Sequence, residues 1–122
     1  TLFVMGCGRL FEGTPEQMVK SLAKLTALPG ETRVYCAHEY TQTNGRFALT
    51  VEPDNADLVA LMAEVDDKRR RGIPTVPSTL AQELKTNPFL RPASQDLQRT
   101  VGLLGADVVE VFAETRRRKD VF

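Results

Sequence analysis

Two short runs of β-forming residues, one on each side of a helix, most constrain how this chain can fold. The first run, Thr1–Met5, is almost continuously apolar, which is typical of a buried strand. The second run, Thr32–Ala37, is rich in β-formers and leads directly to His38. Strand, helix and strand in this order predict a right-handed unit whose two strands are parallel. Side chains at the carboxyl ends of such strands usually face ligands, so we expect His38 at a binding edge.

The helix between the two runs has clear start and stop signals. Thr14 can cap it, Pro15 suits its first position, and Gln17 can complete a capping box. Pro29–Gly30 ends it. Glycines at positions 6, 8 and 13 predict a tightly turning loop between the first strand and this helix.

From Thr41 onward the pattern changes to helices joined by proline-rich segments. The sequence predicts five helices. The first is Asn44–Val51, and the second is capped by Asp54 or Asn55, buries Leu58, Leu61, Met62 and Val65, and runs to Gly72. The third is capped by Ser78 or Thr79 and runs through Leu84, the fourth is Gln95–Leu104, and the last starts at Asp107, bears Val108, Val109 and Phe112, and ends in Arg116–Lys119. We therefore expect an α+β chain with one part over residues 1–40 and an all-helical part over residues 41–122.

Two predicted strands are too few for a stable sheet. An isolated strand pair is marginal in water, and apolar strands of a parallel sheet expect helices on both faces. The missing strands would come from a segment upstream of Thr1, or copies of this chain would pair their strand edges. The first residue is Thr1 and opens directly into an apolar run, which favours removal of an upstream segment.

Composition excludes several classes of function. The chain has 122 residues with 16 basic and 16 acidic side chains, so no overall charge attracts nucleic acid or an anionic membrane. Two cysteines are too few for a secreted disulfide framework, which favours a reducing cytoplasm. No run has the length of a membrane span, and no signal peptide begins the chain.

The residue types alone leave the chemistry open. His38 is the only histidine and cannot build a catalytic zinc site by itself, so a metal ligand and a hydrogen-bonded structural histidine are alternatives. Cys7 and Cys36 could join His38 on a structural zinc, although the chain lacks the paired-cysteine spacing of such sites. Glu12, Glu39 and Glu52 are dispersed and form no acid and base pair.

The basic and phenolic candidates also have two interpretations each. Arg9 in the glycine loop could bind an anion or hold the loop to a carboxylate. Arg116 and Lys119 share a helix face and could bind carboxylates, or they could be the solvated end of a helix. Tyr40 could hydrogen-bond a substrate or simply pack beside His38.

Five segments in order resemble glyoxalase II, the hydroxyacylglutathione hydrolase family. They are Thr1–Thr14, Val34–Thr41, Val51–Pro53, Thr86–Arg91 and Arg116–Phe122. Together they extend over nearly the whole chain, so this resemblance is far more specific than any single short motif. It implies the last strands of a metallo-β-lactamase-type αββα domain followed by a small helical domain.

The resemblance also implies a reaction and a set of site residues. The family hydrolyses S-lactoylglutathione to lactate and glutathione with two divalent metals, zinc with iron or manganese as alternatives. His38 matches the ligand of the second metal, and Arg116 with Lys119 matches the basic pair that binds the glycine carboxylate of glutathione. The implied substrate-binding set is Arg9, Phe11, His38, Glu39, Tyr40, Arg116 and Lys119.

Two departures from the family pattern limit what this chain can do. The family's other metal ligands lie upstream, with the bridging aspartate immediately before Thr1, so only His38 remains and no complete catalytic set is present. Phe11 stands where some members have a tyrosine. We therefore expect a fragment that is inactive alone, binds no stoichiometric metal, and has a missing N-terminal domain as its partner. A non-catalytic helical binding module is the alternative.

Overall fold

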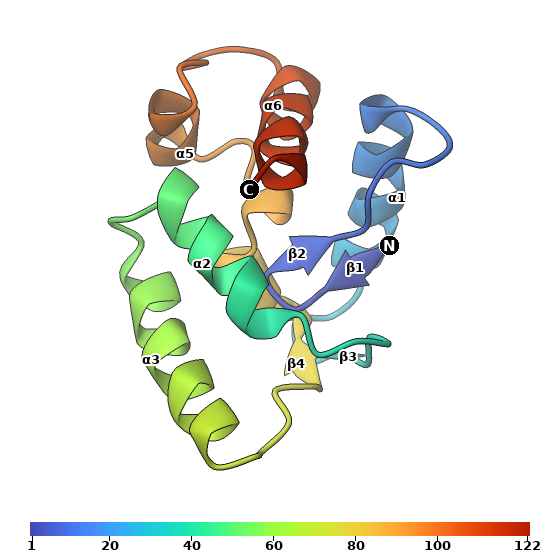
Figure 1. The fold of residues 1–122 in the computed structure, drawn as a ribbon. Helices are drawn as coiled ribbons and strands as arrows, with labels where there is room; N and C mark the ends of the chain where they lie inside the picture. The colour runs from blue at the N-terminus through green and yellow to red at the C-terminus, as the bar shows by residue number, and fades with distance from the viewer.

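The computed structural model describes residues 1–122 and shows two small sheets surrounded by helices (Figure 1). The elements are β1 Leu2–Phe3, β2 Gly6–Cys7, α1 Pro15–Thr26, β3 Arg33–Val34, α2 Thr41–Val51, α3 Ala56–Arg70, β4 Ser78–Thr79, α4 Leu80–Thr86, the 3₁₀ turn η1 Pro88–Leu90, α5 Gln95–Thr100 and α6 Val108–Asp120. The chain is therefore α+β, and β4 is the only strand within residues 41–122.

The helix starts follow the capping signals of the sequence. The Thr14 hydroxyl accepts from the Gln17 amide at 3.2 Å, and the Gln17 side chain accepts from the Thr14 amide at 2.9 Å, which completes the predicted capping box. Asn55, Thr79 and Asp107 cap α3, α4 and α6. Helix α2 begins at Thr41, three residues before its predicted start, and α5 ends at Thr100 rather than at Leu104. All the expected helices form.

The predicted parallel strand unit is wrong. β1 pairs with β2 and β3 pairs with β4, and both pairs are antiparallel. The apolar run does not continue as a strand because the chain reverses at Val4 and Met5, where Met5 has a φ of 56°. A non-glycine residue in this left-handed region needs support from its surroundings.

Three polar side chains, from α2, from α4 and from the residue after α4, supply that support. Glu83 accepts the Met5 amide proton at 2.8 Å, and the Asn44 side chain donates to the Val4 carbonyl at 3.1 Å. Asn87 donates to the Phe3 carbonyl at 3.2 Å and to the Gly6 carbonyl at 3.0 Å. The β1–β2 hairpin is thus held by α2, α4 and the residue that follows α4.

Helix α2 separates two apolar clusters. Its Phe47 and Val51 pack with Phe89, Phe112 and other residues of α1, α5 and α6, whereas its Ala48 packs with Met5 and the buried face of α3. Gly45 lets α2 approach closely, because a β-carbon there would overlap the Met62 sulfur and the end of Met5. In Figure 1, α2 runs across the molecule, with α3 packed beside it and α5 above its far end.

The buried face of α3 is as predicted, and of the three apolar residues expected on α6 only Phe112 is fully buried. Leu58, Leu61, Met62 and Val65 are all buried. In α6 the buried side chains are Val111, Phe112, Thr115 and Arg116, while Val108 is 39% exposed. The face of α6 that packs on the core therefore includes a charged residue.

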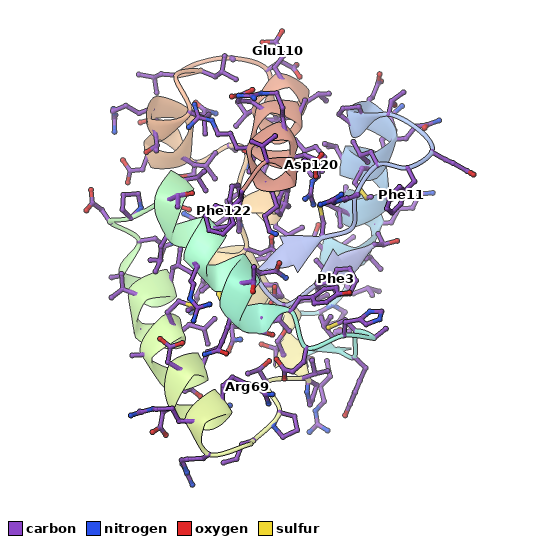
Figure 2. The ribbon with its side chains drawn as sticks, viewed as in Figure 1. Phe3, Phe11, Arg69, Glu110, Asp120 and Phe122 are labelled. Carbon is purple, nitrogen blue, oxygen red and sulfur yellow. The ribbon has the colours of Figure 1, made fainter.

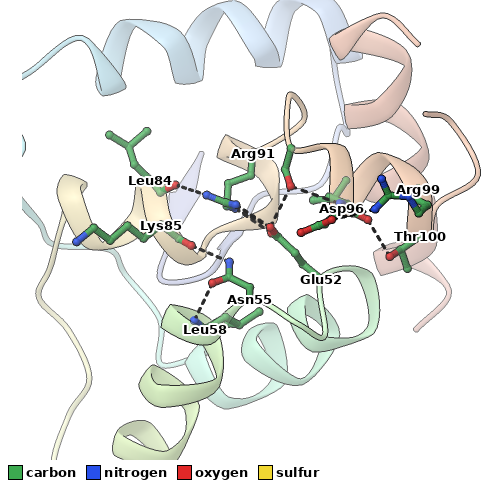
Figure 3. A network of polar contacts seen from close by, with 11 residues as sticks. Glu52, Asn55, Leu58, Leu84, Lys85, Arg91, Asp96, Arg99 and Thr100 are labelled. Carbon is green, nitrogen blue, oxygen red and sulfur yellow. Dashed lines mark hydrogen bonds and ion pairs between the residues drawn. The ribbon is translucent and has the colours of Figure 1, made fainter. Parts of the chain in front are cut away.

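A buried ion pair ties α2 to the chain after α4 (Figure 3). Arg91 donates to both carboxylate oxygens of Glu52, at 2.8 and 2.7 Å, and Ser94 donates to the same carboxylate at 3.0 Å. Glu52 is only 3% exposed, so this two-point pairing compensates for its loss of water. Two of the segments that carry the family resemblance meet here, and their role is structural.

The predicted division at residue 40 remains a prediction. The β3–β4 pair and the Glu83 contact to Met5 both cross it. None of the helices is long and apolar enough to cross a membrane.

Candidate functional site

A cavity of about 780 Å³ opens between the β1–β2 hairpin, the segment that leads into α2, and the end of α6. It is lined by Thr1, Phe3, Cys7, Gly8, Arg9, Phe11, His38, Tyr40, Thr43, Asn44, Arg116 and Lys119. Six of the seven residues in the predicted substrate-binding set line it, although they come from three separate parts of the chain. Figure 2 shows Phe3 and Phe11 on this side of the molecule, with Asp120 between α6 and the loop that carries Phe11.

One end of the cavity is cationic, and Arg116 is its most constrained member. Its guanidinium is 6% exposed and donates to the Cys7 carbonyl at 2.7 Å. It also pairs with Asp120, with Nη2 2.8 Å and Nε 3.0 Å from one carboxylate oxygen, and it lies 5.0 Å from the centre of the Phe89 ring. Arg116 therefore joins α6 to the hairpin as well as facing the cavity.

The two other cations of this end are more accessible. Arg9 is 61% exposed, and its Nε lies 3.8 Å from the same Asp120 oxygen. The pKa of Lys119 is lowered by burial and by the neighbouring charges of Arg116 and Arg9. Three cations around a single carboxylate leave this end of the cavity positive, so it is suited to an anionic ligand.

The burial of Cys7 shows that solvent has little access to the protein side of the cationic end. Burial raises the pKa of its thiol to about 11, even though Arg116 lies 3.7 Å from the sulfur and favours the thiolate. The sulfur is therefore a neutral packing group rather than a nucleophile.

The other end of the cavity is aromatic and open. The rings of His38 and Tyr40 are stacked, 4.9 Å apart and 5° from parallel, and Phe3 lies 5.4 Å from Tyr40. Tyr40 is 51% exposed and His38 is also exposed. The only nearby cysteine, Cys36, directs its sulfur toward the His38 carbonyl at 3.9 Å.

This end does not form a metal site from the residues of this chain. Nowhere do three His, Cys, Asp or Glu side chains come close enough together to hold a metal ion. A metal ion held by His38 would therefore need further ligands from outside this group of residues.

Comparisons with known proteins show the family of the chain. The model of the hydroxyacylglutathione hydrolase C-terminus matches residues 39–122. The chain belongs to this family. It is 62% identical to the hydroxyacylglutathione hydrolase of Methylococcus capsulatus and 58% identical to those of Maricaulis maris and Ruegeria pomeroyi, each over all of its 122 residues. It spans 48% of the length of each, about half of these relatives.

One member of the substrate-binding set expected from the hydroxyacylglutathione hydrolase resemblance, Glu39, does not line the cavity. Its carboxylate accepts the Thr75 amide at 2.6 Å and the Thr75 hydroxyl at 2.9 Å, and it lies 3.9 Å from Arg69. Burial raises its pKa, but these hydrogen bonds and the Arg69 charge outweigh burial and lower it. Through its hydrogen bonds to Thr75, Glu39 fixes the segment before α2 against residues 73–77. It thereby helps to hold its neighbours His38 and Tyr40 in place.

Sequence reasoning missed the residues that hold the site of this hydroxyacylglutathione hydrolase segment in place. Glu83 is completely buried, and its carboxylate accepts from Met5, Ser78 and Asn87. Burial raises the pKa of Glu83, while these hydrogen bonds act to lower it. In the sequence Glu83 resembles an ordinary residue on a helix surface, so nothing marks it as buried. The only signal of these contacts was Asn87, which lies within a segment that resembles the family.

Proposed function

We propose that this chain is the glutathione-binding part of a hydroxyacylglutathione hydrolase that cleaves S-lactoylglutathione, and that it supplies one metal ligand, His38. The observation that carries the proposal is the cavity with its two unlike ends, which brings Arg9, Arg116 and Lys119 to one side and His38 with Tyr40 to the other. Its volume of about 780 Å³ is within the usual range for small-molecule sites.

The two ends correspond to the chemistry of such a substrate. Glutathione carries carboxylates, for which the cationic end offers charge-assisted hydrogen bonds. Binding a carboxylate there would extend the rest of the molecule along the cavity toward Phe3, Tyr40 and His38. In this proposal the chain binds and orients the thioester, while the metal-dependent hydrolysis needs ligands from an upstream part of the protein.

The upstream part would also cover an apolar groove. Nine of the twelve residues that line this groove are hydrophobic, among them Leu2, Leu25, Leu28, Val34 and Tyr35. β1 pairs only with β2, and β3 only with β4, so each sheet leaves strand edges unpaired at this groove. Self-association of the chain through the same edges is the alternative, and sedimentation of the chain with and without the first half of the Methylococcus capsulatus relative distinguishes the two.

A glutathione titration followed by amide NMR shifts tests the binding role. We expect saturable shifts at Arg9, Tyr40 and the end of α6. Lys119→Ala should weaken binding about tenfold, which corresponds to one charge-assisted hydrogen bond. Lys24→Ala, which removes an exposed lysine from α1, should leave binding unchanged. Absence of saturable shifts at millimolar glutathione would contradict the proposal.

The chain alone should show no turnover of S-lactoylglutathione, with or without added zinc. Metal-dependent turnover by the pure chain would contradict the part of the proposal that places the other ligands upstream.

A further inference from the structure

Asp120 stands at a position that helix energetics disfavours. It is the last residue of α6, where the helix dipole favours positive charge, and it follows Arg117, Arg118 and Lys119. Its partner Arg116 precedes it by four residues, which is the weaker order for an ion pair on a helix. The stability of α6 by itself therefore does not account for a carboxylate here.

The contacts of Asp120 point instead toward the cavity. A single oxygen, Oδ1, accepts from Arg116 Nε at 3.0 Å and Nη2 at 2.8 Å, and it lies 3.8 Å from Arg9 Nε. Arg9 belongs to the loop after β2, and Arg116 belongs to α6, so the same carboxylate links two separate cation-bearing segments. Oδ1 is the only acidic atom within ion-pair distance of either arginine.

Without that carboxylate the cationic end would not hold its shape. Arg9, Arg116 and Lys119 repel one another, and the 61% exposed Arg9 is free to turn into solvent. Arg116 would keep its hydrogen bond to the Cys7 carbonyl but lose the two contacts that fix the plane of its guanidinium.

We propose that Asp120 is a positioning residue for the cationic end of the cavity: it fixes the Arg116 guanidinium and keeps Arg9 beside it, so that the cations bind a ligand carboxylate together. This role rests on the proposed function in one respect only, which is that glutathione is taken as the ligand. Two effects of removing the charge have opposite signs. Loss of positioning weakens ligand binding, whereas the gain in net positive charge would strengthen it.

The test compares Asp120→Asn with a matched substitution on the same helix. Glu114→Gln also removes one carboxylate from α6, but the partners of Glu114 are Arg117 and Arg118, which do not line the cavity. We expect Asp120→Asn to raise the Kd for glutathione about tenfold. Asp120→Glu should recover most of that loss, and Glu114→Gln should have no effect. Unchanged or tighter binding by Asp120→Asn, or an equal loss in Glu114→Gln, would overturn the proposal.

A measurement without ligand separates this role from the proposed function. NMR of the arginine Nε protons should show slowly exchanging signals for Arg116 in the parent chain and in Asp120→Glu, and fast exchange in Asp120→Asn. If the parent chain does not bind glutathione but these signals behave as expected, the proposed function fails and the positioning role stands. If Arg116 exchange is the same in Asp120→Asn as in the parent, the positioning role fails whatever the ligand.

Discussion

The two ends of the cavity differ in how they are built. The cationic end is completed by this chain, because Arg116 contacts Asp120, the Cys7 carbonyl and the Phe89 ring, and these contacts join α6, the hairpin and η1. The aromatic end consists of exposed rings stacked on one another, and His38 belongs to no group of three potential metal ligands. The difference teaches that hydrogen bonds and ion pairs between distant segments fix the cationic end, whereas ring stacking is the main contact between the side chains of the aromatic end.

The largest expected change in stability is at Glu83, which holds the β1–β2 hairpin, and this hairpin lines the cavity with Phe3 and Cys7. Glu83→Ala removes the acceptor of three buried donors, Met5, Ser78 and Asn87, and should lower the free energy of unfolding by on the order of 3 kcal/mol. Chemical denaturation measures it. Lys85→Ala on the exposed face of the same helix is the control, with an expected change below about 0.5 kcal/mol. Equal stabilities for the two variants would mean that the hairpin does not depend on α4.

The second effect tests how closed the cationic end is. With a thiol pKa of about 11 instead of the ordinary 9.0, Cys7 should have a thiolate population about a hundredfold below that of an ordinary thiol at pH 8. Alkylation followed by mass spectrometry should modify the half-exposed Cys36 first. Because the pKa of Cys7 is raised in the folded state, its contribution to stability should be lost as pH rises from about 9 toward 11. Modification of Cys7 as fast as Cys36 at pH 8 would show that this wall is open.

The third effect concerns the buried arginine. Arg116→Ala should cost about 2 kcal/mol of stability, less than for a fully buried ion pair because Asp120 is 41% exposed. The neighbouring Arg117 is 63% exposed, and Arg117→Ala should cost less than about 0.5 kcal/mol. Thermal and chemical unfolding of both variants provides the comparison, and similar losses would remove the structural distinction between these two arginines.

The smallest effect is expected at the aromatic end. His38→Ala removes one ring of an exposed stack and should change the free energy of unfolding by no more than about 0.5 kcal/mol. The zinc content of the purified chain should be below one per molecule both with and without His38. A large loss of stability, or stoichiometric zinc that disappears in His38→Ala, would show that this end is also complete in the isolated chain.

Much of the secondary structure could be predicted because its signals are local. The capping box of Thr14 and Gln17, and the caps at Asn55 and Thr79, each connect residues three positions apart, and these helices begin as expected. The strands could not be predicted in the same way. The reversal at Met5 is held by Glu83, which lies 78 residues away, and the glycines that signal a turn come only after the apolar run.

The features of the candidate site also separate into those set by local sequence and those set by long-range contacts. The sequence by itself determined which segments form helices, the cations at the end of α6 and, through the order of its motifs, the hydroxyacylglutathione hydrolase family. Only the tertiary structure decided that Arg116 is buried against Cys7 while Lys119 and Arg9 stay accessible, and that Glu39 faces away from the cavity. The physical reason is the range of the interactions: a cap is satisfied within one helical turn, whereas the environment of a charge depends on groups that only the complete fold brings together.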